Sequence, residues 1–246
     1  MFSFLGSIAT FWSTESTNWT PTTPLPRGYV EERLQFVIPV HEGSSISLDP
    51  QGASSHGTVV FDKESSRVGK PTDGPPAYDV AVGIDSKGKS SRGELRIEVV
   101  CRHDNAQLWQ EVRMEQSHGP GDVVGLKIST PGNSLAYLSS HLSFHVTFLF
   151  PASPLKIQRL SVHGAGWRTL GTPSLAQIHF DDVSILTGGA PVDFRSLVAG
   201  QVVIENSNAS VSGEYRVESI RIKTVNGRID AVVEARKACV CETKNE

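Results

Sequence analysis

The C-terminal third of this 246-residue chain carries a spaced pattern that constrains the fold more than any other feature of the sequence. Two apolar residues two positions apart are followed by Thr or Asn, then by Gly or Asn, and then by another apolar residue. The pattern begins at Val183, Val202 and Ile220, so its offsets are 19 and 18 residues. The three copies are Val183, Ile185, Thr187, Gly189 and Val192; Val202, Ile204, Asn206, Asn208 and Val211; and Ile220, Ile222, Thr224, Asn226 and Ile229.

This spacing favours stacked strands. Side chains two apart in a strand share one face, so the apolar members of each copy would lie one above the next in a common core. A repeat near 20 residues is typical of one turn of a coiling β-structure. The alternate positions carry charge, as at Glu205 and Arg221, and would face solvent. We therefore predict a β-solenoid-like stack with turns of 18–19 residues.

The corners between these strands are rich in residues that enter left-handed backbone conformations at low cost. They are Gly188, Gly189, Asn208, Asn226 and Gly227, and we expect such conformations there. The pair Asn226-Gly227 is the strongest turn signal in the chain. An antiparallel meander would also contain Asn-Gly turns and is the alternative, although hairpins are usually spaced more closely and less regularly.

The N-terminal half also favours β-structure. Short runs of alternating or β-branched residues are bounded by Gly, Pro, Asn, Asp or Ser. In the clearest run, Leu142–Phe148, apolar residues alternate with polar ones, so one face would meet the core. Residues 133–141 are the best of the weak helix candidates. The predicted strands are 34–40, 58–61, 78–82, 95–101, 108–114, 123–128 and 142–150.

The fold class predicted from these patterns is all-β, with an N-terminal sheet or sandwich-like region that continues into the C-terminal solenoid-like stack. Pro151 and Pro154 interrupt the chain between the two regions. We expect four segments: a Ser, Thr and Pro-rich leader over 1–28, the N-terminal β region over 29–152, the repeats over 153–238 and a polar tail over 239–246.

Charge and hydropathy argue against two classes of partner. The 23 Lys and Arg residues against 26 Asp and Glu leave a formal net charge of −3, so no field would draw nucleic acid. No apolar run reaches the ~20 residues that a membrane-spanning helix needs. The first basic residue is Arg27, so no standard secretory signal is evident, and both the cytoplasm and the cell surface stay open. The oligomeric state and the role of the apolar N-terminus, Met1–Trp12, stay open as well.

Residues 83–90, Gly-Ile-Asp-Ser-Lys-Gly-Lys-Ser, match the pattern of a phosphate-binding loop. That mechanism requires a helix directly after the loop, whose N-terminal amides hold the phosphates. Residues 93–99 alternate as a strand instead. We therefore expect a charged hairpin loop and no nucleotide or other cofactor.

Candidate metal ligands are sparse. On a strand, His141 and His145 would lie ~13 Å apart, which no single ion bridges. Cys239 and Cys241 could offer two thiolates, but a tetrahedral site needs two further ligands. We predict no metal site and leave open whether the two cysteines pair. Two glycosylation sequons occur, at Asn18 and Asn208, and we expect Asn208 to be a corner residue of the repeat.

Acidic residues aligned across successive coils could form a polysaccharide-cleaving site. The repeat places Asp193, Ser212 and Asp230 at equivalent outward positions, with the two carboxylates ~9.6 Å apart at two strand spacings. That separation is near the range in which an acid and a base flank a sugar with water between them. Asp193 and Asp230 are therefore the candidate catalytic pair of an enzyme alternative.

Two short segments resemble a known family. Residues 211–215, Val-Ser-Gly-Glu-Tyr, and 223–230, Lys-Thr-Val-Asn-Gly-Arg-Ile-Asp, are similar to repeats of the putative adhesin family of bacteria and fungi. The resemblance covers roughly residues 155–235. It implies a stacked β-solenoid fold and a surface or binding role, and it brings no catalytic residues.

The functional expectation is a non-catalytic binding or structural protein, adhesin-like, that recognises a protein or glycan surface through its sheet faces and loops. The alternative is a carbohydrate-active enzyme with a groove along the solenoid. A deep cleft around Asp193 and Asp230 would favour the enzyme, whereas a flat face there would favour the binder.

Overall fold

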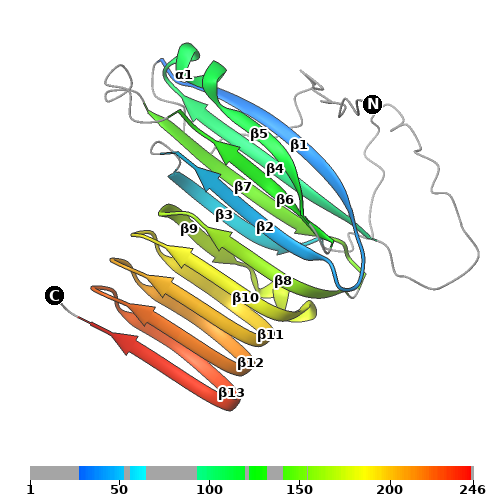
Figure 1. Ribbon diagram of the computed structural model, residues 1–246, viewed down its shortest axis with the longest axis vertical. Coiled ribbons are helices and arrows are strands. Elements are labelled where there is room, and N and C mark those ends of the chain that lie inside the picture. The colour runs from blue at the N-terminus through cyan, green and yellow to red at the C-terminus, as the bar shows by residue number, and fades with distance from the viewer. Residues whose placement is uncertain are drawn as a thin grey trace, which may run out of the picture.

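A computed structural model describes residues 28–52, 56–64, 93–119, 122–131, 141–153 and 155–244 (Figure 1). Several predictions from the sequence fall wholly or largely outside these ranges and are not tested. They are the leader over 1–28, the strand over 78–82, the loop over 83–90, the helix candidate over 133–141 and the sequon at Asn18.

The described chain is almost entirely strand, which confirms the all-β prediction. The N-terminal strands are β1 (Val30–Val40), β2 (Ser45–Gln51), β3 (His56–Lys63), β4 (Gly93–His103), β5 (Arg113–Gly119), β6 (Val123–Ser129) and β7 (Leu142–Phe150). The C-terminal strands are β8 (Lys156–His163), β9 (Gly166–Gly171), β10 (His179–Thr187), β11 (Val192–Asn206), β12 (Val211–Thr224) and β13 (Ile229–Thr243). Two short helices, α1 (Ala106–Glu111) and the 3-10 helix η2 (Pro173–Gln177), complete the described elements.

These strands form one sheet that folds back on itself into a barrel-like or sandwich-like arrangement. Its order is β1-β4-β7-β3-β9-β11-β10-β8-β2-β6-β5, with β12 beside β11 and β13 beside β12. We call β1-β4-β7-β3-β9 the first wall and β5-β6-β2-β8-β10 the second wall. The walls join at β11, because Val192–Phe194 pair with β9 and 198–206 pair with β10. The N-terminal strands are thus continuous with the C-terminal ones, instead of forming a separate sandwich.

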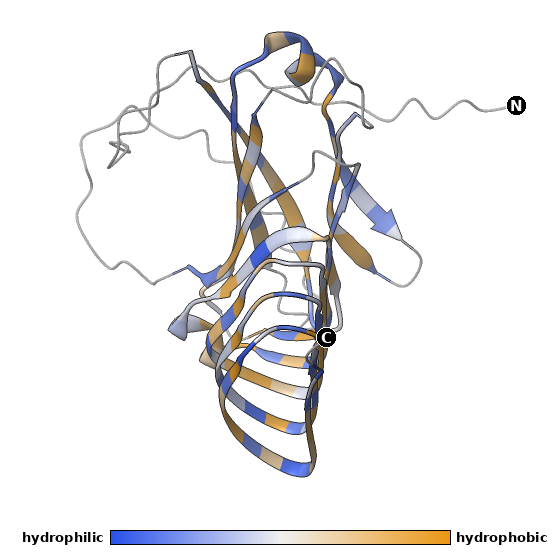
Figure 2. Cartoon of the chain, turned by 90° about the vertical axis from the view of Figure 1, so that its left-hand side faces the viewer, coloured by the Kyte–Doolittle hydropathy of each residue, from blue (hydrophilic) through white to orange (hydrophobic). Residues whose placement is uncertain are grey.

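Alternation along each strand decides which side chains enter the core between the walls. In β7, Leu142, Phe144, Val146 and Phe148 are buried, as the sequence predicted. Phe150 of the first wall meets Phe180 of the second edge to face, with ring centroids 5.9 Å apart. Phe61 and Phe194 stack at 6.5 Å where β3 approaches β11. Bands of hydrophobic and hydrophilic residues alternate along the strands in Figure 2.

Strands β10 to β13 are stacked in parallel at the C-terminal end of the sheet (Figures 1 and 2). Val183 pairs with Val202, and Val202 pairs with Ile220, so the residues that the sequence pattern places 19 and 18 apart are direct neighbours. Ile204 and Ile222 are fully buried. The antiparallel meander is therefore wrong for these strands.

Each of the last three strands bends between two arms. The first arms are 192–197, 211–217 and 229–235, and the second arms are 198–206, 219–224 and 238–243. The register shifts near the bends, between Phe194 and Leu197 where β11 pairs with β12 and between Val217 and Ser219 where β12 pairs with β13. We call the strands β10 to β13 the parallel stack. Its first arms extend the first wall and its second arms extend the second wall.

The left-handed corners predicted from the sequence are wrong. Among the described residues, positive φ occurs at Asp122 and at four glycines, Gly28, Gly43, Gly52 and Gly213, and at none of the five predicted corner residues. Buried polar side chains shape the corners instead. The Asn206 side-chain oxygen accepts hydrogen bonds from the backbone N–H groups of Asn208 and Ala209, both at 3.1 Å. Thr224 Oγ1 accepts in the same way from Gly227 N at 3.0 Å.

Gly227 is nevertheless constrained by space. A Cβ atom there would lie 1.9 Å from the carbonyl oxygen of Ala209 in the preceding corner. Successive corners therefore approach too closely for a side chain at this position. The sequence pattern correctly requires glycine at this corner. The reason is the close approach of the preceding corner and not a left-handed backbone conformation.

The strand predicted over 108–114 is also wrong, because its first residues form α1. The side chain of Asn105 caps this helix by accepting hydrogen bonds from the backbone N–H groups of Gln107 at 2.9 Å and Leu108 at 3.2 Å. Such a cap satisfies N–H groups that a helix start leaves unpaired. Leu108 is the buried residue of the helix. Strand β5 begins only at Arg113.

Most of the segment predicted as a polar tail is strand. Residues 239–243 form the second arm of β13, where Cys239 pairs with Ile220 and Cys241 with Ile222. Hydrogen bonds to β12 and the β-branched side chains of Val240 and Thr243 favour a strand over a solvated tail. Among the described residues, no helix is long and apolar enough to span a membrane.

Candidate binding site

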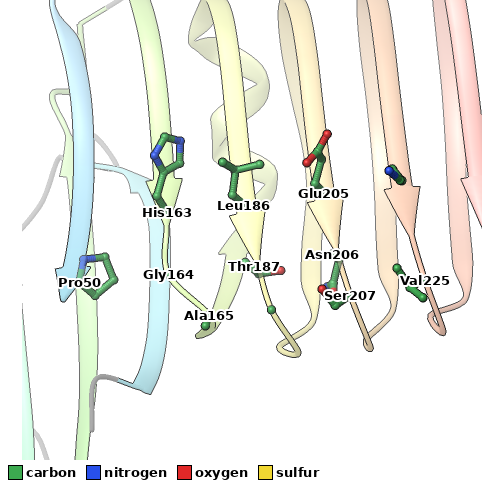
Figure 3. Close-up of a pocket in the computed structure, with 12 residues that line it drawn as sticks. Pro50, His163, Gly164, Ala165, Leu186, Thr187, Glu205, Asn206, Ser207 and Val225 are labelled. Carbon is green, nitrogen blue, oxygen red and sulfur yellow. The ribbon is translucent and has the colours of Figure 1, made fainter. Parts of the chain in front are cut away.

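An open groove crosses the C-terminal ends of five parallel strands, β2, β8, β10, β11 and β12 (Figure 3). It has a volume of about 520 Å³. Each strand delivers residues from its last positions and from the bend that follows, as with His163 and Gly164 after β8. The parallel register brings these ends together, because every strand of the second wall involved here runs in the same direction. We call this feature the corner groove.

One row of outward side chains forms the wall of the corner groove. Leu186 pairs with His163 on one side and with Glu205 on the other, and Glu205 pairs with Lys223. The labelled side chains of His163, Leu186 and Glu205 project in parallel from neighbouring strands in Figure 3. Neighbouring strands are ~4.8 Å apart, so this row presents imidazole, aliphatic, carboxylate and ammonium groups at regular intervals. Such a row fits an extended polar chain lying across the strands.

The backbone behind the groove is held by its own hydrogen bonds. Gly164 N donates to Leu186 O at 3.0 Å, and Gly188 N donates to Ala165 O at 2.9 Å. Beneath the surface, the Asn206 amide donates to Ala190 O at 2.8 Å. The groove is therefore a preformed surface whose outward side chains are exposed to solvent, with His163 Nε2 3.4 Å from Ser184 Oγ.

A second concave site lies on the outer face of the first wall. Its volume is about 740 Å³, and residues of β1, β3, β4, β7 and β9 line it. Glu31 organises its rim: the carboxylate oxygen atoms accept hydrogen bonds from Arg33 at 2.7 Å and from Arg102 at 3.0 Å. We call this feature the wall pocket. Sequence reasoning missed it, because its residues come from five strands, β1, β3, β4, β7 and β9, whose neighbours are set by long-range pairing.

His145 lies in the wall pocket with its ring partly open to solvent. The surrounding walls desolvate the imidazolium form, and the nearby Arg102 guanidinium also disfavours it, so the pKa of His145 is lowered. Both effects favour the neutral imidazole over the imidazolium. Glu98 also lines the pocket, so the acidic and basic groups nearly balance there.

The structure places Asp193 and Asp230 where the repeat predicted, but away from both concave sites. Asp193 pairs with Ser212, and Ser212 pairs with Asp230, on the first arms of the parallel stack. Neither aspartate lines the corner groove or the wall pocket. Asp230 is exposed and accepts a hydrogen bond from Arg228 at 3.1 Å. Their catalytic role stays a prediction.

The histidines and cysteines that were considered and rejected as metal ligands lie as follows in the described residues. His141 is exposed and contacts Asp104, with Nδ1 and Oδ2 3.1 Å apart. Cys239 and Cys241 are exposed free thiols whose sulfur atoms lie 4.0 Å apart. No group of three or more His, Cys, Asp or Glu side chains in the described ranges is placed to hold an ion. Asn208 lies at an exposed bend, where it accepts a hydrogen bond from the Asn226 amide at 3.1 Å.

Comparison with known proteins gives weak structural likenesses. No family model matches the chain, and no curated protein matches it. A putative cell adhesion protein from Clostridium sporogenes is 10% identical, covers 87% of this chain and 100% of its own, and has a TM-score of 0.37. A putative adhesin from Parabacteroides merdae is 7% identical, covers 87% and 96%, and scores 0.31. A putative adhesin from Parabacteroides distasonis is 11% identical, covers 87% and 97%, and scores 0.33. TM-scores this low assign neither a fold family nor a function.

Proposed function

We propose that the chain is a non-catalytic, adhesin-like binding protein whose parallel stack is a short β-solenoid. The corner groove is its binding site, and the ligand is an extended polar chain such as a glycan. The residues that contact this ligand are the outward row His163, Leu186, Glu205 and Lys223.

The observation that carries this proposal is the set of acidic residues that line the corner groove. Glycoside hydrolysis by the usual route needs two carboxyl groups that flank one bond. Among the described residues, Glu205 is the only Asp or Glu that lines the corner groove. Glu205 lies beside Lys223 in the strand register. The groove therefore offers opposite charges for polar contacts and lacks the second acid of a cleavage site.

The carbohydrate-active enzyme remains the second candidate and rests on the column of Asp193 and Asp230. Their strand positions are two spacings apart, as the enzyme alternative requires. Asp230 is paired with Arg228 on an exposed surface, which disfavours a cleavage site, because substrates usually bind in clefts.

A polysaccharide pull-down tests the binding proposal. The full chain is incubated with insoluble chitin, cellulose and xylan, and the bound fraction and the release of reducing ends are measured. We expect retention on at least one of them without release of reducing ends. Glu205→Ala combined with Lys223→Ala should lower the affinity at least tenfold.

The matched control is Glu214→Ala combined with Arg216→Ala. These two exposed residues lie on the first arm of β12, outside the corner groove, and carry the same pair of charges. The control should bind within about twofold of the unmodified chain. The proposal would be contradicted if both double variants lost affinity equally. It would also be contradicted if the unmodified chain were retained on none of the three polysaccharides. Release of reducing ends that Asp193→Asn abolishes would establish the enzyme instead.

A further inference from the structure

Strand β13 presents a long open edge. It has 15 residues and pairs with β12 on one side only, with no strand of the described chain on its other side. An unpaired strand edge offers a row of free N–H and C=O groups that can template another strand. Figures 1 and 2 show β13 as the terminal layer of the parallel stack.

The hydrophobic core is also incompletely covered at this layer. Along the first arm of β12, Val211, Tyr215 and Val217 are buried. The corresponding first arm of β13 supplies Ile229, Ala231, Val233 and Ala235, which are only partly buried. On the second arm, Cys239 and Cys241 are exposed where their neighbours Ile220 and Ile222 are buried. One more layer would complete the burial of both arms.

The other two sheet edges are better protected. Strand β5 has seven residues and carries Arg113 and Glu115 at exposed positions. Strand β1 contains Pro39, which has no N–H to donate to a further strand. Short length, charge and proline are the usual devices against edge pairing. Strand β13 carries charges, but it is neither short nor interrupted by proline, and it exposes Val232 by 71% and Val240 by 42%.

The sequence of β13 is matched to itself about its midpoint. Arg236 is the central residue of Ile229–Thr243, and Val232 and Val240 lie four residues to either side of it. Antiparallel pairing of two copies about Arg236 places Val232 opposite Val240 of the second copy. Such directly opposed β-branched side chains stabilise antiparallel strand pairs. The inward row is matched as well, because Val233 comes to lie opposite Cys239 of the second copy.

We propose that the β13 edge is a docking surface for a second copy of this chain, in a two-fold dimer with antiparallel β13 strands. A two-fold axis through the bend exchanges the first and second arms, whose lengths are similar, and keeps the inward row facing inward. A two-fold interface is closed, so association stops at the dimer.

Most charges on β13 are compatible with this pairing, although Arg236 at its centre would face Arg236 of the second copy. Asp230 would lie opposite Glu242 of the second copy, but each has a cation in its own chain. Arg228 lies 3.1 Å from Asp230, and Arg221 lies 3.8 Å from Glu242. Lys237 is likewise engaged by Glu218 of its own chain. The like charges of Asp230 and Glu242 are thus partly neutralised.

Sedimentation equilibrium of the full chain under reducing conditions tests the dimer. The expected mass is twice 26.6 kDa. Val232→Lys combined with Val240→Lys should weaken association at least tenfold, since four ammonium groups would meet across the interface. The control Val37→Lys alters another exposed valine, 48% accessible on β1, and should dimerise as the unmodified chain does.

Disulfide trapping then tests the register. In Val233→Cys the new thiol should face Cys239 of the second copy, and oxidation should give a covalent dimer at least tenfold faster than in the unmodified chain. Val232→Cys, on the outward row, is the control and should crosslink no faster than the unmodified chain. A monomeric mass, open-ended growth with concentration, or a dimer indifferent to the lysine variants would overturn the proposal. Because the corner groove does not include β13, these outcomes are independent of polysaccharide binding.

Discussion

Gly213 shows how strongly a single residue can be constrained in the parallel stack. It has φ +132°, and a Cβ atom there would lie 2.0 Å from the carbonyl oxygen of Phe194. Other residues rarely adopt this φ, and the backbone of the neighbouring strand cannot move away without breaking its pairing. The unfavourable φ and the steric clash would therefore both destabilise a variant with a side chain at position 213.

We expect Gly213→Ala to lower the free energy of unfolding by roughly 2–4 kcal/mol. Urea denaturation followed by circular dichroism measures the change. Gly189→Ala is the control, because Gly189 has open space around its Cβ position and no positive φ. Its effect should stay within about 0.5 kcal/mol. Equal effects of the two substitutions would refute the steric explanation.

Glu31 gives the wall pocket a pH dependence. Burial alone would raise the pKa of its carboxyl group, but the hydrogen bonds and charges of Arg33 and Arg102 outweigh burial and leave the pKa lowered. A carboxyl group whose pKa is lower in the folded state stabilises the fold above its unfolded pKa of about 4.3. That contribution is lost as the pH falls through the folded-state pKa.

Glu31→Gln should therefore cost up to about 1 kcal/mol of unfolding free energy at pH 7, since its arginine partners remain in contact with water. The difference from the unmodified chain should shrink as the pH is lowered below 4. Urea denaturation at pH 7 and at pH 3 checks the sign. The exposed residue Glu115 of β5 supplies the control variant Glu115→Gln. A difference that grows toward low pH would contradict the assigned cause.

At the scale of elements, the corners depend on buried polar side chains at the ends of the second arms. Thr187, Asn206 and Thr224 occupy equivalent positions in successive strands and are all buried. Asn206 accepts from two backbone N–H groups and donates to a backbone carbonyl group. Removal of its amide would deprive the backbone N–H groups of Asn208 and Ala209 of their acceptor, and would leave Ala190 O with the longer hydrogen bond from Thr187 Oγ1 at 3.3 Å.

Asn206→Ala should accordingly lower the free energy of unfolding by roughly 2–3 kcal/mol. Asn206→Thr should recover part of this loss, because threonine serves the same position in the strands on either side. Asn208→Ala, at the exposed neighbouring position, should cost less than about 0.5 kcal/mol. Thermal and urea unfolding compare the three variants. An alanine variant as stable as the threonine variant would exclude the hydrogen-bonding role.

The sequence predicted elements best where alternation was long and undisturbed. Leu142–Phe150 and the residues of the parallel stack have this property, because burial on one face imposes a period of two. Residues 108–114 were misassigned, since the cap of Asn105 on α1 is a local hydrogen bond that outweighs apolar content. The sequence alone indicated that charged positions such as Glu205 and Lys223 face outward, but it did not indicate that the residues of the corner groove form one site. Their arrangement in one site depends on β2 pairing with β8, across more than 100 residues of chain.

At the scale of the whole molecule, the continuity of the sheet opposes independent folding of its parts. Strand β2 pairs with β8, and β3 pairs with β9, so the predicted boundary near residue 153 separates strands that share hydrogen bonds. Each half would expose unpaired edges and core residues if the other unfolded. The division into segments 29–152 and 153–238 stays a prediction.

We expect the two segments to unfold together. Hydrogen exchange followed by mass spectrometry, over a series of urea concentrations, reports the protection of peptides from each segment separately. The midpoints should coincide within error, as they do when one cooperative unit unfolds. Protection in 155–238 that survives the loss of protection in 29–152 would instead establish two folding units.

Because the parallel stack repeats with a regular register, its length along the stacking direction can change by one strand at a time. Because β12 pairs only with β11 and β13 among the described strands, a duplicated segment of 18 or 19 residues could enter beside β12 and leave the remaining strand pairs intact. Every such duplication would lengthen the corner groove by one strand spacing and add one outward side chain to its row. Gene duplication on this scale would thus tune the reach of the surface without any redesign of its interior.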